Sequence, residues 1–223
     1  MKLTTEQIEY VSNYIQSFDI KFYELKVELT DHFVSIMEEI WNEDLELSFH
    51  QVKYRAEKRF GRNYFKEVEQ ERRNILRKQF NLSHRKMVSE YLKFPKIALS
   101  ILMVFVVYRI SFYFEDISFY IKILYGILLG ASLFTMLNWY RYRKINGKKF
   151  LSLETVLIVN NKSISFSYFA IIGVNSFKET FPENYLFYLP FCFLWVLGVV
   201  LIITGYQITN KVVSNIKKQY QLT

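Results

Sequence analysis

The sequence predicts an all-α protein, in which an N-terminal cytoplasmic helical bundle is followed by a four-helix transmembrane bundle. Glycine and proline are scarce, at 7 and 3 of 223 residues, which argues against a β protein rich in turns. Up to about residue 93, apolar residues recur at helical spacing. Beyond residue 93, the chain contains long, nearly uncharged runs of the length that crosses a bilayer.

The net charge of +8 is distributed unevenly along the chain. Residues 1–93 carry 16 basic and 16 acidic side chains, whereas residues 94–223 carry 13 basic and 5 acidic ones. Basic residues that flank apolar runs are typical of membrane-protein loops. We therefore expect the lipid bilayer, and not a nucleic acid, to be the partner of this charge. Residues 1–10 are polar and lack the apolar core of a cleavable signal peptide.

Residues 1–62 predict a cytoplasmic domain of three helices. Thr4 and Gln7 match a capping box at the start of the first helix. The apolar stripe of that helix consists of Ile8, Val11, Ile15 and Phe18. Ser48 and Gln51 repeat the capping-box pattern at the start of the third helix.

Residues 63–93 predict a charged helical linker that joins this domain to the membrane. It contains a helix over about Tyr64–Phe80, followed by a link through residues 81–86, NLSHRK. Residues 1–47 have a net charge of −8, and residues 48–93 have a net charge of +8. We expect these two parts to attract each other, although each exposed ion pair contributes only about 0–1 kcal/mol.

Residues 94–210 predict the transmembrane domain, and residues 211–223 a cytoplasmic tail. The predicted spans are residues 94–114, 120–140, 163–181 and 185–206. Each has about the 20 residues that cross about 30 Å of hydrocarbon.

The start of the third span has two interpretations, because Asn160, Asn161 and Lys162 interrupt its apolar run. A lysine at the bilayer centre costs about 3 kcal/mol or more. We favour a span that starts near Ser163, with Leu151–Val159 at the interface, since it buries no charge. In the alternative, the span includes the three polar residues and turns them toward the bundle, which would make them candidates for a functional site.

Loop charges predict the orientation in the membrane. The loop RYRKINGKK, residues 141–149, holds five basic residues, and the C-terminal tail adds three lysines. The short loops around EDIS and KETFPEN hold four carboxylates. The positive-inside rule then places both termini in the cytoplasm of a multi-pass inner-membrane protein. Arg109, near the outer end of the first span, most simply extends to the headgroups, with a gating or ligand role as the alternative.

The second predicted helix, Tyr23–Trp41, places His32 among five carboxylates. On a helical wheel, an apolar arc adjoins an acidic arc, and His32 lies at their boundary. Glu28 and His32 are spaced to share a metal ion, but they supply two ligands where a catalytic zinc site needs about three. The favoured interpretation is a structural histidine that hydrogen-bonds to Glu28 or to a backbone carbonyl. Metal binding and pH sensing are the alternatives.

The segments ELKVELTDHFVSIMEEIW and SFHQVKYRAEKRFG resemble the small α-helical domain of the HAAS type. The match covers about residues 4–62 and closes on Ala56 to Gly61, in the manner of that family's A…FG ending. It is also similar to the permease-prefix segments that precede membrane spans in bacteria. The resemblance implies a domain that precedes transmembrane helices and works with a PadR-like regulator.

The leading hypothesis is a non-enzymatic signalling or accessory membrane protein without cofactor or metal. Its cytoplasmic domain would bind a soluble regulator or permease subunit, or form a homo-oligomer. The candidate partner-binding or sensing residues are Glu28, Asp31, His32 and Glu39. The alternative is a small transporter or permease subunit. Its polar route would use Asn138, Asn160, Asn161, Lys162, Asn175 and Thr204, with Pro190 as a kink. No motif of a nucleophile with its base, a phosphate loop or HExxH supports catalysis.

Overall fold

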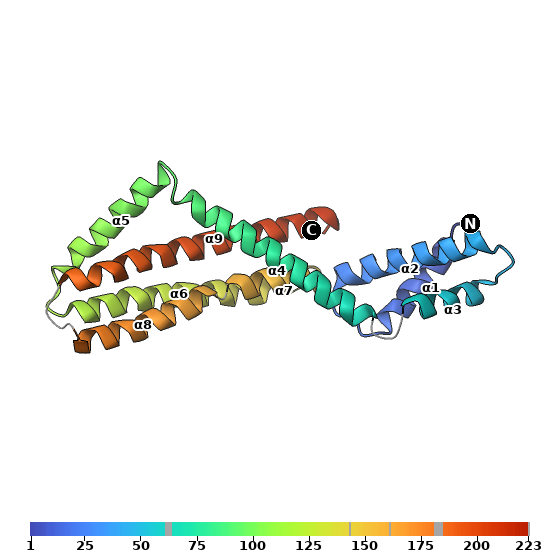
Figure 1. Cartoon of the computed structure of the whole chain (residues 1–223), viewed down its shortest axis with the longest axis horizontal. Coiled ribbons are helices and arrows are strands. Elements are labelled where there is room, and N and C mark those ends of the chain that lie inside the picture. Colours follow the sequence, from blue (N-terminus) through green and yellow to red (C-terminus); the bar gives the residue numbers. More distant parts are fainter. Residues whose placement is uncertain (61–63, 143, 161, 181–184, 223) are drawn as a thin grey trace. The chain divides into compact units, whose positions relative to one another are not determined.

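The structure is a computed structural model of the whole chain (Figure 1). It describes residues 1–60, 64–142, 144–160, 162–180 and 185–222. The side chains of residues 60, 138–142, 162–163, 175, 177–180, 185 and 187 are outside this description. Within the described ranges the regular structure is helical, apart from one isolated bridge between Ile145 and Lys148. The prediction of an all-α chain is therefore confirmed.

The helices divide between two compact units. In chain order they are α1 (Thr5–Gln16), α2 (Tyr23–Glu43), α3 (Phe49–Phe60), α4 (Tyr64–Glu90), α5 (Lys96–Ser111), α6 (Ile117–Tyr142), α7 (Leu151–Asn160), α8 (Lys162–Thr180), the 3₁₀ helix η1 (Tyr185–Tyr188) and α9 (Leu189–Gln219). The N-terminal unit consists of Met1–Leu76 and Lys144–Ser152. The apolar unit consists of Arg77–Arg143 and Leu153–Thr223.

Both predicted capping boxes are present in the N-terminal unit. The Thr4 backbone N–H donates to Gln7 Oε1 over 2.9 Å, and the Gln7 N–H donates back to Thr4 Oγ1 over 3.4 Å. Ser48 and Gln51 exchange the equivalent bonds at the start of α3. The core between α1, α2 and α3 contains the buried side chains Val11, Ile15, Leu25, Leu29, Phe33, Met37, Val52 and Ala56.

The predicted link at residues 81–86 is wrong, because α4 continues without interruption from Tyr64 to Glu90. Asn81 and Ser83 are weak helix formers. Neither residue breaks a helix, however, and the first proline after Tyr64 is Pro95. The linker is therefore mostly one helix of 27 residues.

Helices α6, α8 and α9 pack together in the apolar unit, as Figure 1 shows. Two aromatic side chains join α6 to α9: the Tyr125 hydroxyl donates to the Phe191 carbonyl, and the Trp195 indole N–H donates to the Leu124 carbonyl, each over 2.8 Å. Gly198 allows the closest approach, since a Cβ there would lie 2.5 Å from Leu128 Cδ2. Such contacts at small residues are typical of helix packing in membranes.

Within the described residues, three helical stretches are long and apolar enough to cross a membrane: Ile117–Leu137, Leu151–Val174 and Leu189–Gln219. They agree with the prediction of a membrane protein. Helix α5 coincides with the predicted first span but has only 16 residues, or about 24 Å at about 1.5 Å per residue. Helix α9 extends through most of the predicted tail to Gln219.

Candidate functional site

Two carboxylates of the predicted acidic face of α2 pair with arginines of α3 and α4. Glu28 Oε2 lies 3.6 Å from Arg72 Nε, and Glu39 Oε1 lies 3.1 Å from Arg59 Nη2. Each of these four side chains is about half exposed, so the two ion pairs contribute little to stability. The pairing joins the acidic half of the N-terminal domain to its basic half.

His32 lies exposed on the same helix. Its Nδ1 is 3.3 Å from the Tyr64 hydroxyl of α4, and the two rings meet edge to face with centroids 6.0 Å apart. Asp31 is also exposed. In the described part of the chain, no group of three or more histidine, cysteine or carboxylate side chains is placed to hold a metal ion. The contact with Tyr64 makes His32 a link between α2 and α4.

A second cluster on α2 involves residues far away in the sequence, in the loop between α6 and α7. This loop contains a two-residue hairpin turn, in which Ile145 and Lys148 exchange two backbone hydrogen bonds of 3.0 Å. Asn146 and Gly147 have φ angles of 49° and 77°. Positive φ at both central residues is the type I′ turn that Asn-Gly favours.

Tyr23, the first residue of α2, contacts three consecutive loop residues. Its backbone N–H donates to the Lys149 carbonyl over 2.8 Å. The Lys148 ammonium lies 3.7 Å from the centroid of the Tyr23 ring, a cation–π distance. The Phe150 ring packs edge to face against the Tyr23 ring, with their centroids 5.9 Å apart. Phe150 and Leu151 are both buried. The loop is thus part of the N-terminal unit.

Glu24 completes this cluster by capping the first turn of α7. Its Oε1 accepts the Ser152 backbone N–H over 2.6 Å, and its Oε2 accepts the Ser152 hydroxyl over 2.8 Å. A carboxylate at a helix N-terminus satisfies open N–H groups and interacts favourably with the helix dipole. Burial raises the pKa of Glu24, while the hydrogen bonds from Ser152 and Leu151 and the Arg72 charge act in the opposite direction.

Sequence reasoning did not find the role of Glu24, which was one carboxylate of an acidic arc. The Asn-Gly pair before Lys148 was the available signal, because it marks an ordered turn. Nothing in the local sequence of α2 or α7 links Glu24 to Ser152, which are 128 residues apart.

Two of the predicted polar residues, Asn160 of α7 and Thr204 of α9, make hydrogen bonds between helices. The Asn160 side-chain amide donates to the Gly205 carbonyl over 3.0 Å and to Thr209 Oγ1 over 2.7 Å. His84 Nε2 lies 3.0 Å from Thr204 Oγ1. The Thr204 hydroxyl also lies 2.8 Å from the Val200 carbonyl of its own helix.

The other predicted polar residues are placed only in part. Arg109 is exposed, and its guanidinium lies 5.8 Å from the centre of the Phe112 ring. The side chains of Asn138, Lys162 and Asn175, and the whole of Asn161, lie outside the described residues.

Comparison with known proteins adds no relative: no family model, curated protein or solved structure matches the chain.

Proposed function

We propose that the chain is a non-catalytic signalling or accessory protein of the inner membrane, whose cytoplasmic helical domain binds a partner and is coupled to the membrane helices. The observation that carries the proposal is the loop between α6 and α7. Its buried residues Phe150 and Leu151 and its cap by Glu24 make this loop an integral part of the N-terminal unit. A change in that unit would therefore reach α7 along the chain.

The same contact constrains the topology. Two segments in contact must lie on the same side of a membrane, so the chain between Leu76 and Lys144 must cross an even number of times. Helix α6 is long and apolar enough to cross. If α6 crosses, α5 is the helix lying wholly within that interval that remains, and we propose that it crosses as well. The short α5 is compatible with a bilayer that thins locally or with flanking residues that extend to the interface.

The contacts along α9 support α8 as the third span. Asn160 lies beside Gly205 and Thr209. Gly198 lies close to Phe166 of α8, since a Cβ atom added to this glycine would be 3.3 Å from the Phe166 ring. Gly173 of α8 lies close to Phe191 of α9, since a Cβ atom added to this glycine would be 3.7 Å from the Phe191 ring. Helix α8 is therefore antiparallel to α9, and Asn160 lies opposite the end of the apolar run that closes at Tyr206. This register supports a third span that starts near Ser163, as favoured from the sequence.

The resemblance of residues 4–62 to the HAAS type supports a soluble regulator or a permease subunit as the partner. For the transport alternative, polar side chains would have to face a route. Asn160 and Thr204 instead bond to neighbouring helices, which favours a packing role for both.

The test is a mild-detergent pull-down of the full-length, C-terminally tagged protein from its native membranes, read by mass spectrometry. We expect a regulator or permease subunit in stoichiometric amount. A variant without residues 1–76 should insert into the membrane and lose that protein. Equal recovery with both forms, or a homo-oligomer that carries ion flux in proteoliposomes, would contradict the proposal.

A further inference from the structure

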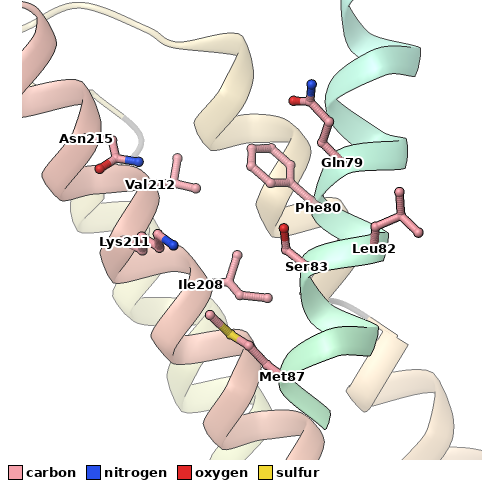
Figure 2. A pocket seen from close by; sticks show the side chains of 9 residues that line it. All are labelled: Gln79, Phe80, Leu82, Ser83, Met87, Ile208, Lys211, Val212 and Asn215. Carbon is pink, nitrogen blue, oxygen red and sulfur yellow. The ribbon is translucent and has the colours of Figure 1, made fainter. Parts of the chain in front are cut away.

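Helices α4 and α9 enclose a groove in the apolar unit that the proposed function does not use. It has a volume of about 460 Å³, within the range typical of ligand sites. Figure 2 shows Phe80 and Met87 of α4 directed toward α9, and Ile208 of α9 directed toward α4. The hydrogen bond between His84 and Thr204 holds the two helices together beside the groove.

The lining has an apolar part and a polar part. Phe80 and Met87 are half-buried, and Ile208 and Val212 are buried. The polar part consists of Gln79, Ser83, Lys211 and Asn215, all of which are exposed. These four side chains offer one ammonium, two amides and one hydroxyl, and no carboxylate. They can donate several hydrogen bonds to an anion while the apolar part covers a hydrocarbon chain.

The charged residues in the parts of α4 and α9 on either side of the groove are all basic. Residues 77–89 of α4 contain four basic and no acidic residues, and residues 207–219 of α9 contain three basic and no acidic ones. Lys211 is five residues beyond Tyr206, where the apolar run of α9 closes. Basic pockets at the ends of transmembrane helices are suited to anionic lipid headgroups.

We propose that this groove binds one anionic phospholipid of the surrounding membrane. Lys211 binds the headgroup phosphate, with Gln79, Ser83 and Asn215 as hydrogen-bond donors, and part of an acyl chain lies along Phe80, Met87 and Ile208. The proposal requires the membrane location of α9 and is independent of any protein partner. A failed pull-down would therefore leave it intact.

Native mass spectrometry of the delipidated full-length protein in detergent tests the site. Phosphatidylglycerol and phosphatidylcholine with the same acyl chains are titrated separately. We expect one phosphatidylglycerol to bind about fivefold more tightly, the ratio that one lysine near an anionic headgroup contributes. Lys211→Gln should remove this preference. Lys217→Gln, on the same helix but outside the groove, is the matched control and should keep it.

A second variant tests the apolar part. Ser83→Phe replaces an exposed lining residue with a ring that fills the groove, and it should weaken the binding of both lipids with an unchanged unfolding temperature. Equal binding of the two lipids, equal losses in Lys211→Gln and Lys217→Gln, or full retention of lipid by Ser83→Phe would overturn the proposal. Displacement of the lipid by inorganic phosphate at the same concentration would overturn it too, since the site would then bind free anions.

Discussion

Glu24 joins α2 to the segment between α6 and α7 through its hydrogen bonds with Ser152. Both oxygens of Glu24 accept hydrogen bonds from Ser152, whereas Glu28 and Glu39 are half exposed and pair with arginines. Glu24 is half-buried, and the partial loss of water around its carboxylate would be unfavourable without such donors. The cap therefore explains why a glutamate is tolerated at this position.

Replacing Glu24 with alanine should loosen the loop from the N-terminal unit. Loss of a helix cap costs about 1 kcal/mol, so hydrogen exchange of residues 144–152 should become about fivefold faster. Glu28→Ala, one turn further along α2, removes only a half-exposed ion pair and serves as the control. Equal exchange in the wild type and in Glu24→Ala would show that the cap does not hold the loop.

Docking of the loop should also depend on pH. Burial raises the pKa of Glu24, so the docked state binds the proton more tightly than the undocked state. Docking is then strongest below the ordinary pKa of glutamate, near about 4.3, and weakens as the pH rises through the raised pKa. Exchange protection of residues 144–152, corrected for the intrinsic rate, should fall over this window. In Glu24→Gln the fall should be absent, and its persistence there would assign the effect to another group.

At the scale of the helices, α9 packs tightly against α6 and α8 at Gly198, where there is no room for a side chain. A side chain at this position would displace Leu128 of α6 and press on Phe166 of α8. Leu128 is buried at 2% exposure, so it has little room to move.

Gly198→Leu should therefore destabilise the apolar unit by about 1–3 kcal/mol, as overpacking of a core does. The measurement is the unfolding temperature of the full-length protein in detergent. Gly130→Leu on α6 is the matched control, because the added Cβ meets nothing within 4 Å and the change should be small. A similar loss at both positions would indicate helix propensity, and not packing, as the cause.

The sequence was informative where structure depends on near neighbours. The boxes at Thr4 and Ser48 follow from residues three positions apart, and they are present. The contact of His84 with Thr204 spans 120 residues, and no periodic pattern reports it. The same limit explains why the end of α4 was predicted too early, at Phe80. Asn81 and Ser83 are weak helix formers, but the segment that contains them is held against α9 by the hydrogen bond between His84 and Thr204.

For the whole molecule, the central question is whether α5 and α6 cross the membrane. The contact between α2 and the loop requires both on one side of the membrane. If α6 crosses, the segment between α5 and α6 must then lie on the opposite side. Tyr113 in that segment is 86% exposed and suits a labelling site, whereas Lys148 in the loop reports the other side. The single Cys192 is buried and can be replaced to give a background without reactive thiols.

The most direct measurement is therefore cysteine labelling with a membrane-impermeant maleimide in intact cells, with Cys192→Ala as the background. We expect Tyr113→Cys to be labelled in intact cells, and Lys148→Cys and Lys217→Cys to be labelled only after the membrane is opened. Protection of Tyr113→Cys in intact cells, together with protection of Lys148→Cys, would show that α5 and α6 do not cross. Labelling of Lys148→Cys from outside would contradict a cytoplasmic N-terminal domain.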